Sequence, residues 1–323
     1  MRVLVTGAGG FIGQALVAAL SERASPGSAA ADRTPARSFV LTDRVEPRTS
    51  PPRSRSEIGD IADAGLHDRL FDEPIDLVVH LAGIVSGAAE ADYALGKRVN
   101  LDATIALLER CRDQVARGGP VPRFVYASSI AVFGTPLPTR IDDATAPAPT
   151  LSYGAHKRAC ELLIDDCSRR GFIDGRALRL SGVVVRPPLA NGALSGFNSD
   201  LIREPLARRD YVCPVTPEAT IWIVSLRHAI ANLIRMADAP ADALGPQRAL
   251  TTPSLAVSVA DIVAALGRVD RAAPARIRFE PQPAIEAQFG RWPLDCAFER
   301  GRALGLTCDA SLDETIRTHL ELA

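Results

Sequence analysis

A tyrosine and a lysine four residues apart carry the clearest chemical signal in this sequence. Tyr153 and Lys157 follow a pair of serines, Ser128 and Ser129, that close an apolar segment. Residues four apart share one face of a helix, which places the lysine ammonium beside the phenol. A free phenol has a pKa of about 10, and a neighbouring cation favours the phenolate and lowers that pKa. Tyr153 can then accept the proton of an alcohol while a serine hydroxyl holds the substrate oxygen.

A glycine-rich turn at the start of the chain predicts a dinucleotide site. The apolar run Val3-Leu4-Val5 leads directly into Thr6-Gly7-Ala8-Gly9-Gly10-Phe11-Ile12-Gly13. In this pattern Gly7 permits a tight turn, Gly10 lets the backbone approach a pyrophosphate, and Gly13 lets the following helix pack on the strand. The N-terminus of that helix offers free N–H groups and a positive dipole to the phosphates.

An acidic residue at the end of the second predicted strand indicates which dinucleotide binds. Asp43 closes Val40-Leu41-Thr42-Asp43, where a carboxylate accepts hydrogen bonds from the adenosine ribose and repels a 2′-phosphate. It favours NAD over NADP, although Arg44 beside it is a residue type that can hold a 2′-phosphate. Asp60, in Gly59-Asp60-Ile61, either reaches the adenine amine or is a plain turn residue.

Strand and helix patterns alternate through the first half, which predicts an α/β protein with a doubly wound parallel sheet of the Rossmann type. We expect strands at 2–6, 39–43, 77–81, 123–127 and 176–180, and helices at 11–22, 92–111 and 153–170. The segments 24–38 and 46–56 are interpreted as surface insertions.

The alternation fails beyond residue 186, which predicts a second, smaller lobe. We expect a helix at 198–208, a strand at 220–224 that returns to the sheet, and helices at 226–237, 259–266 and 312–322. Residues 1–185 and 220–250 would form the dinucleotide-binding domain. Residues 186–219 and 251–323 would form a substrate-capping lobe over the carboxyl ends of the strands, where open sheets bind ligands.

Composition excludes several other classes of protein. The net charge is −1 and no basic cluster is interleaved with aromatics, so no nucleic-acid partner is expected. No apolar run approaches the roughly 20 residues of a membrane span, and the N-terminal strand is unlike a signal peptide. The six cysteines form no CxxC pair and no metal-like spacing with histidine, which suits a reducing cytoplasm and a protein without metal. His80 is interpreted as a packed strand histidine.

The order of these motifs resembles the extended short-chain dehydrogenase/reductase family, which includes NAD-dependent epimerases and dehydratases. The resemblance covers residues 1 to about 240 and rests on TGAGGFIG, HLAG, VNLDAT, YASSIAVFG and YGAHK. It implies NAD as cofactor, Tyr153 as the base, Lys157 as its electrostatic partner, and Ser129 rather than Ser128 as the catalytic hydroxyl. It also implies a homodimer formed through the helices at 92–111 and 153–170. The implied cofactor contacts are Gly7, Gly10, Phe11, Ile12, Gly13, Asp43, Asp60, Ala82, Gly83, Asn100, Tyr153, Lys157 and Pro187.

The second half indicates the substrate. Residues 180–187 replace the segment where the family's epimerases bind a sugar nucleotide, whereas 195–206 and 222–225 resemble those of family members that oxidise a small, four-carbon sugar acid at carbon 2. Such an acid needs a cation for its carboxylate, which Arg203 or Arg186 can supply, and short polar groups for its hydroxyls. Trp222 either walls the pocket or fills the core. The expected substrate contacts are Ser86, Ser129, Tyr153, Asn198, Arg203 and Trp222, with Ser199 as a further candidate.

Three alternatives remain open at this point. The first is an enzyme like L-threonine 3-dehydrogenase, in which an amino acid replaces the sugar acid. The second is a nucleotide-sugar epimerase, in which hydride is taken and returned. The third is an NAD-sensing binding module without turnover, which commonly lacks the tyrosine and lysine that this chain keeps as Tyr153 and Lys157.

Overall fold

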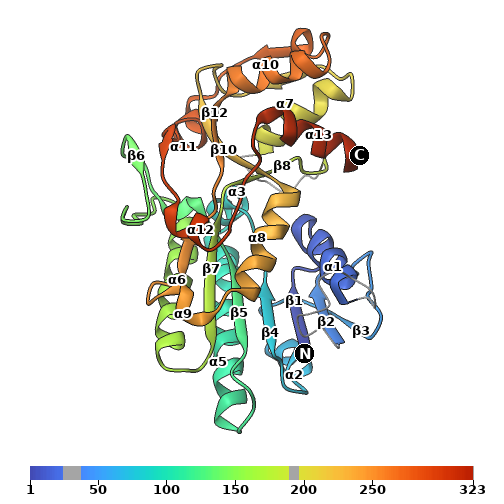
Figure 1. Cartoon of the computed structure of the whole chain (residues 1–323), viewed down its shortest axis with the longest axis vertical. Helices are drawn as coiled ribbons and strands as arrows, with labels where there is room; N and C mark the ends of the chain where they lie inside the picture. Colours follow the sequence, from blue (N-terminus) through green and yellow to red (C-terminus); the bar gives the residue numbers. More distant parts are fainter. Residues whose placement is uncertain (25–37, 189–195, 323) are drawn as a thin grey trace.

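A parallel sheet forms the lower part of the molecule in Figure 1 and a smaller lobe lies above it. The computed structural model describes residues 1–24, 38–188 and 196–322. Most of the predicted insertion at 24–38, and residue 195 of the substrate-indicating segment 195–206, lie outside the described residues. No helix of the described part is long and apolar enough to cross a membrane.

In the part of the chain that the structure describes, the sheet has seven strands in the order β11-β7-β5-β4-β1-β2-β3, and all of its pairings are parallel. The strand order reverses beside β1, so that the crevice between β1 and β4 is a ligand position in such sheets. The predicted doubly wound α/β fold is confirmed. The strands are β1 (Arg2–Thr6), β2 (Ser38–Asp43), β3 (Ser54–Ile58), β4 (Leu77–His80), β5 (Arg123–Ser129), β7 (Asp174–Leu180) and β11 (Ala249–Thr251).

Helices cover both faces of the sheet because its strands are apolar on both faces. On one face α1 (Phe11–Ala24) and α8 (Leu226–Asp238) share a core that includes Leu16, Leu233 and Met236. On the other face the core includes Leu66, Leu107 and Ile164. These three residues come from α2 (Ala64–Leu70), α5 (Ala103–Ala116) and α6 (Ser152–Arg169).

The predicted helix at 92–111 is wrong as a single helix. It consists of α4 (Tyr93–Lys97), a π-helical turn at Arg98–Asp102 and α5, and α3 (Ser86–Ala91) precedes it. Asp92 caps α4 by accepting from Leu95 N at 2.9 Å, which separates α4 from α3. The π-turn contains Asn100, whose side chain bonds to both main-chain polar groups of Ile84. Such turns recur where a side chain serves a site.

Two further expectations about strands are wrong. The segment 46–56 is not wholly an insertion, because Ser54–Ile58 forms the edge strand β3. This strand is polar and lacks the apolar pattern from which the other strands were predicted. The strand at 220–224 does not return to the central sheet. It is β10 (Thr220–Ser225), which lies between β8 (Gly182–Val184) and β12 (Leu255–Ser258) in a separate three-stranded sheet. The free edge of β7 is occupied by β11 instead.

The smaller lobe is built around that second sheet. Its core includes Ile221 and Ile223 of β10, packed against α7 (Phe197–Leu206), α10 (Val259–Val269) and α13 (Leu312–Leu322), which Figure 1 shows together at the top. The division of the chain at 186, 220 and 251 stays a prediction. The remaining elements are η2 (Ile130–Val132), β6 (Arg140–Ile141), β9 (Tyr211–Cys213), α9 (Ala241–Leu244), η4 (Pro274–Arg276), β13 (Ile277–Phe279), α11 (Pro283–Phe289), β14 (Asp295–Cys296) and α12 (Glu299–Ala303).

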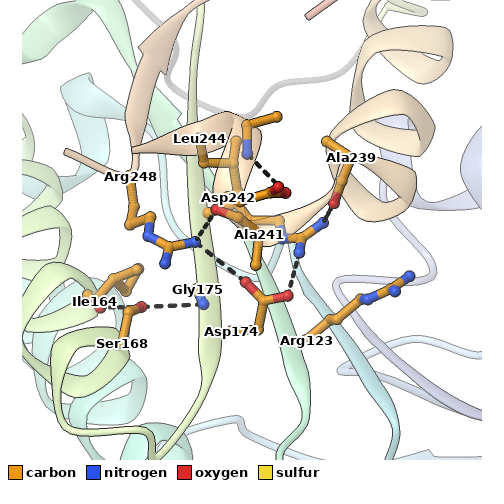
Figure 2. A network of polar contacts seen from close by, with 12 residues as sticks. Arg123, Ile164, Ser168, Asp174, Gly175, Ala239, Ala241, Asp242, Leu244 and Arg248 are labelled. Carbon is orange, nitrogen blue, oxygen red and sulfur yellow. Dashed lines mark hydrogen bonds and ion pairs between the residues drawn. The ribbon is translucent and has the colours of Figure 1, made fainter. Parts of the chain in front are cut away.

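A buried arginine ties the end of α8 to the central sheet. Arg176 of β7 is 0% exposed, and its guanidinium donates to the carbonyl oxygens of Met236 at 2.6 Å and Ala239 at 2.8 Å. These are carbonyls that a helix end leaves without partners. Figure 2 shows Asp174 beside Arg248, with which it pairs at 3.3 Å. Because Asp174 is the first residue of β7, this network lies at the amino-terminal ends of the strands and fixes the end of α8 there.

Candidate active site

Two adjoining cavities lie at the carboxyl ends of the central strands. The larger has a volume of about 370 Å³ and the smaller about 270 Å³, and both are lined by Gly7, Gly10 and Gly83. The larger one also contacts the lobe. Among the predicted residues, its lining contains Gly7, Gly10, Phe11, Ile12, Gly13, Gly83, Ser86, Ser129, Tyr153, Lys157, Arg186, Asn198 and Trp222.

The glycine turn has the geometry of a phosphate cradle. Gly7 has φ +73°, and a Cβ there would lie 2.7 Å from the main-chain nitrogen of Ala82. A Cβ on Gly13 would lie 2.0 Å from the carbonyl oxygen of Gly7, so α1 packs directly on the turn. The carboxylate of Asp43 accepts from Gly9 N at 3.0 Å and thereby holds the loop. The backbone and the helix N-terminus fit a dinucleotide diphosphate.

The smaller cavity collects the residues predicted for the adenosine end. Asp43, Asp60 and Ala82 line it, and so does Arg44. Burial raises the pKa of Asp60, but hydrogen bonds from Ala62 N and from Arg98 outweigh burial and hold it below its usual range. Asp60 is therefore an ionised acceptor in the cavity wall.

The predicted catalytic group comes together in the larger cavity. Lys157 is 4% exposed and its ammonium donates to the carbonyl oxygen of Ala127 at 2.7 Å. It lies 5.6 Å from the ring centroid of Tyr153 and 4.5 Å from that of Tyr126. Burial lowers the pKa of Lys157 to about 8, because a dry environment penalises the ammonium.

Arg186, which the sequence offered only for the substrate carboxylate, also affects the pKa of the Tyr153 phenol. Burial raises the pKa of the Tyr153 phenol, and its hydrogen bond with the Ser129 hydroxyl and the nearby Arg186 guanidinium lower it by less. The pKa of the phenol is therefore raised above its ordinary value, and the lowered pKa expected from the sequence is not found in this structure. Arg186 is thus a second cation near this phenol, in addition to Lys157, whose ammonium lies over the Tyr153 ring and donates to Ala127 O of β5. The role of Lys157 as the electrostatic partner of Tyr153 stays a prediction.

The two neighbouring serines of β5 have different partners. Ser129 accepts from Ala131 N at 3.1 Å and interacts with the Tyr153 phenol. Ser128 instead donates to the buried carboxylate of Glu161 at 2.6 Å. This separation supports Ser129 rather than Ser128 as the hydroxyl that meets substrate.

Four predicted contacts do not line either cavity, namely Asn100, Pro187, Ser199 and Arg203. The Ser199 hydroxyl instead accepts from Arg186 N at 3.0 Å. Asn100 lies beneath Gly83, where a Cβ would come within 2.9 Å of its side-chain oxygen, so it supports the cavity wall from behind. Pro187 is exposed. Arg203 pairs with Asp200 and Glu204 and donates to the main-chain oxygen of Arg186. Arg203 therefore does not face the predicted substrate position, because its guanidinium is already bonded within the lobe.

The substrate end of the cavity combines buried polar groups with aromatic walls. Asn198 is 5% exposed, and its side-chain oxygen has no hydrogen-bond partner among the described residues. Trp222 fills both roles that were left open: it lines the cavity and packs in a core against Trp292, at a centroid distance of 5.0 Å. Its indole donates to Pro293 O at 2.7 Å. Sequence reasoning missed Ser181, Ile221, Phe289 and Trp292, which also line the cavity.

His80, at the end of β4, has hydrogen-bond partners that account for its position. His80 is fully buried between Thr6 and Thr104, at 2.6 Å and 3.0 Å, and burial with the nearby Lys157 lowers its pKa to about 3. It is a neutral, packed strand histidine, as interpreted. Within the described residues, His228, Asp309 and Glu314 form a group of possible metal ligands that lies outside both cavities. The absence of a metal from the protein stays a prediction.

A glycine cradle after β1, an acid at the end of β2, and a Ser–Tyr–Lys group formed by the carboxyl end of β5 and by α6 define a dinucleotide-dependent Rossmann protein. The chain belongs to the NAD dependent epimerase/dehydratase family, whose model matches residues 3–212. NAD is the cofactor of this family.

Full-length relatives extend the similarity beyond the matched segment. The chain is 42% identical over 325 aligned residues to D-erythronate dehydrogenase of Cupriavidus necator, covering 99% of this chain and 98% of the relative. It is 36% identical to D-erythronate dehydrogenase of Haemophilus influenzae, covering 99% of each. A crystal structure described as the nucleoside-diphosphate-sugar epimerase from Agrobacterium tumefaciens superposes with a TM-score of 0.92 at 37% identity, covering 99% of this chain and 94% of that one.

Proposed function

We propose that this protein is an NAD-dependent dehydrogenase that oxidises the carbon-2 alcohol of D-erythronate, giving 2-dehydro-D-erythronate. The two relatives named for this activity align over nearly the whole chain. The observation that carries the proposal is the presence of Arg186 in the wall of the cavity that also holds Ser129 and Tyr153. An alcohol-oxidising group and a guanidinium in one cavity match a substrate with a hydroxyl beside a carboxylate.

Arg186 has the charge and the fixed position expected of an anion-binding residue. Burial lowers the pKa of its guanidinium, while Tyr153 and Asp200 raise it, and an arginine stays charged in proteins. Its backbone is held by Ser199, whose hydroxyl accepts from Arg186 N at 3.0 Å, and its Nε donates to Val183 O at 3.2 Å. A guanidinium so fixed can bind a carboxylate through its remaining N–H groups.

Asn198 supports a substrate that carries further hydroxyls. Its side-chain oxygen is a buried acceptor without a partner among the described residues, and such a group costs free energy until a donor reaches it. A sugar-acid hydroxyl is a donor of suitable size. Ser86 and Ser181 add further hydroxyls to the same cavity.

The dimensions of the cavity favour a small acid over a nucleotide sugar. Trp222, Trp292 and Phe289 are among the residues that line it, and the nicotinamide would share its volume of about 370 Å³ with the substrate. The nucleotide-sugar epimerase alternative would need space for a second nucleotide beyond this volume. An L-threonine dehydrogenase remains compatible with the size of the cavity and is separated by the assay below.

The proposed mechanism assigns one task to each residue. Bound NAD supplies the hydride acceptor. The Ser129 hydroxyl orients the substrate oxygen, and the phenolate of Tyr153 accepts the hydroxyl proton as the C–H bond at carbon 2 breaks. Arg186 holds the carboxylate and, as a cation near the phenol, favours the phenolate. Because these residues hold the substrate beside the cofactor, the reacting groups need not meet by diffusion, which lowers the entropic part of the activation barrier.

The assay that tests the proposal is the formation of NADH from NAD with D-erythronate, its stereoisomers, L-threonine and nucleotide sugars. We expect turnover with D-erythronate and none with nucleotide sugars. Greater specificity for L-threonine, or turnover with none of these compounds, would refute the proposed substrate.

We also propose a homodimer and a cytoplasmic location. Tyr93, Ile105 and Leu162 are exposed on α4, α5 and α6, the helices expected to form the interface, and burial of such groups favours association. All six cysteines are free, which suits a reducing compartment. Light scattering of the purified protein tests the first proposal, and fractionation of cells that express the natural gene tests the second.

A further inference from the structure

Helix α6 is hydrogen-bonded to the carboxyl end of β5 at two successive strand residues, Ala127 and Ser128. Lys157 donates to the carbonyl oxygen of Ala127 at 2.7 Å, and Ser128 donates to the carboxylate of Glu161 at 2.6 Å. Lys157 and Glu161 are four residues apart, as are Tyr153 and Lys157, so all three share one face of α6. The helix that carries the phenol is therefore bonded directly to the strand that carries Ser129.

Glu161 is itself rigidly held. It is 0% exposed, and Arg179 of β7 binds its carboxylate bidentately through Nε at 2.9 Å and a terminal nitrogen at 2.8 Å. Arg158 of α6 approaches the same carboxylate at 3.0 Å from a more exposed position. A buried carboxylate with an arginine fork and a hydroxyl donor has its geometry fixed from several sides.

A buried serine hydroxyl can satisfy its hydrogen bonding through the local backbone. Burial of Ser128 alone therefore does not require the bond to Glu161. The bond to Glu161 instead fixes the strand end at the residue that precedes Ser129. Consecutive strand residues point to opposite faces, so holding Ser128 toward α6 sets the direction in which Ser129 points. The described contacts of Glu161 are Ser128, Arg158 and Arg179, and it lines neither cavity.

We propose that Ser128 and Glu161 are positioning residues, which act through the strand end to hold the Ser129 hydroxyl against the Tyr153 phenol. The inference rests on the proposed dehydrogenase function. Ser128 also lines the larger cavity, but its hydroxyl is bonded to Glu161. We expect loss of this bond to loosen the Ser129–Tyr153 pair while the other residues that line the cavity stay unchanged. Since its hydrogen bond with Ser129 lowers the pKa of Tyr153, loosening the pair raises that pKa.

The test is the Ser128→Ala variant, assayed for NADH formation with D-erythronate across pH. We expect kcat near neutral pH to fall by about tenfold or more, as for small misplacements of catalytic groups. KM for both substrates should change by less than about twofold. The alkaline rise of kcat should move to higher pH. A lowered melting temperature with unchanged kcat and an unchanged pH profile would show a merely structural role and overturn the proposal.

Two further variants keep the test sharp. Arg158→Ala also removes a partner of Glu161, but from its exposed side, and should stay within about twofold of the natural enzyme. Glu161→Gln keeps the shape and an acceptor oxygen while weakening the bond, so its kcat should lie between those of Ser128→Ala and the natural enzyme. If Ser128→Ala does not fold, a Glu161→Gln enzyme with natural kcat and pH profile overturns the proposal.

Failure of the proposed substrate is distinguishable from failure of this inference. If the natural protein oxidises none of the assayed compounds, ionisation of Tyr153 can be followed by ultraviolet difference spectroscopy in the NAD complex, with Tyr153→Phe to identify its signal. We expect this titration to move to higher pH in Ser128→Ala. An unmoved titration overturns the inference whatever the substrate is.

Discussion

The guanidinium of Arg203 donates a hydrogen bond to the main-chain oxygen of Arg186. Arg203 also pairs with Asp200 and Glu204, so its charge is neutralised within α7. Arg186, in contrast, presents its side chain to the cavity beside Tyr153. The two arginines that the sequence offered for the substrate carboxylate thus divide the work: Arg203 holds backbone, and Arg186 faces the proposed carboxylate.

Replacing Arg186 should weaken binding of the sugar acid. A hydrogen bond to a charged group contributes about 1.5–3 kcal/mol, so we expect Arg186→Gln to raise KM for D-erythronate by about 10- to 100-fold with little change in KM for NAD. Its loss should also move the alkaline rise of kcat to higher pH, because the guanidinium lowers the pKa of Tyr153. Steady-state kinetics with both substrates measure these effects. Arg203→Gln is the matched control, and an equal KM effect in it would contradict the division of roles.

Removing the Tyr153 hydroxyl should abolish most of the turnover. The variant Tyr153→Phe loses the proposed base, which typically contributes about 10²–10⁴-fold, while the glycine cradle that holds the diphosphate is untouched. In the natural enzyme kcat should rise with pH, because the deprotonated phenol is the active form and burial raises its pKa. Turnover and NAD binding by fluorescence titration test this pair of expectations. Natural turnover in Tyr153→Phe would remove the mechanism.

The buried Lys157 should make the stability of the cofactor-free protein depend on pH. Its pKa falls from 10.5 to about 8 on folding, so between these values the unfolded chain binds a proton that the folded chain does not. Lys157 therefore contributes a rise of stability with pH in this window, by at most about 3 kcal/mol from a shift of this size. The cysteines act in the opposite direction, because burial raises the pKa of thiols such as Cys111 and Cys160. Urea unfolding at the two ends of the window should therefore show a more negative change of stability with rising pH in Lys157→Met than in the natural protein. Equal slopes for the two proteins would contradict the shift.

Local sequence patterns predicted the residues that carry the chemistry. They did not predict which strands, far apart in the sequence, pair with each other. Tyr153 and Lys157 share a helix face through spacing alone, and Gly7 and Gly13 are local backbone requirements. These features were predictable from the sequence, as were the bounds of β1, which match residue for residue. They need no knowledge of which strands pair.

The parts that could not be predicted depend on contacts between remote segments. An apolar strand such as β10 does not specify its partner, and it joined β8 and β12 rather than the central sheet. Trp292 reaches the cavity only because its backbone bonds to Thr220, far away in sequence. For Arg186 and Arg203 the residue type was informative, but only the fold decides which guanidinium is already bonded.

The adenosine end of the cofactor site should respond to Asp43 more than to Arg44. Asp43 accepts from Gly9 N, so Asp43→Asn weakens both the glycine turn and the expected ribose contact. We expect affinity for NAD to fall by about tenfold or more, corresponding to one charged hydrogen bond, and the preference for NAD over NADP to shrink as repulsion of the 2′-phosphate is lost. Arg44→Ala should leave NAD affinity nearly unchanged. Calorimetric titration with both dinucleotides decides, and a larger loss of NAD affinity in Arg44→Ala would reverse the assignment.

Gly13 offers the sharpest test of the helix–turn contact. A Cβ there would lie 2.0 Å from the carbonyl oxygen of Gly7 and 2.8 Å from the Cα of Ala8. Both neighbours are backbone and cannot rotate away, so Gly13→Ala must push α1 off the turn. Overpacking of this kind costs about 1–3 kcal/mol or more, and the displaced turn should also lose NAD binding. At Gly196 a Cβ meets no described atom within 4 Å, so Gly196→Ala is the matched control and should keep both stability and affinity. Thermal unfolding with and without NAD measures both quantities, and a Gly13→Ala protein that NAD stabilises as well as the natural one would show that this close approach is not needed for the cofactor.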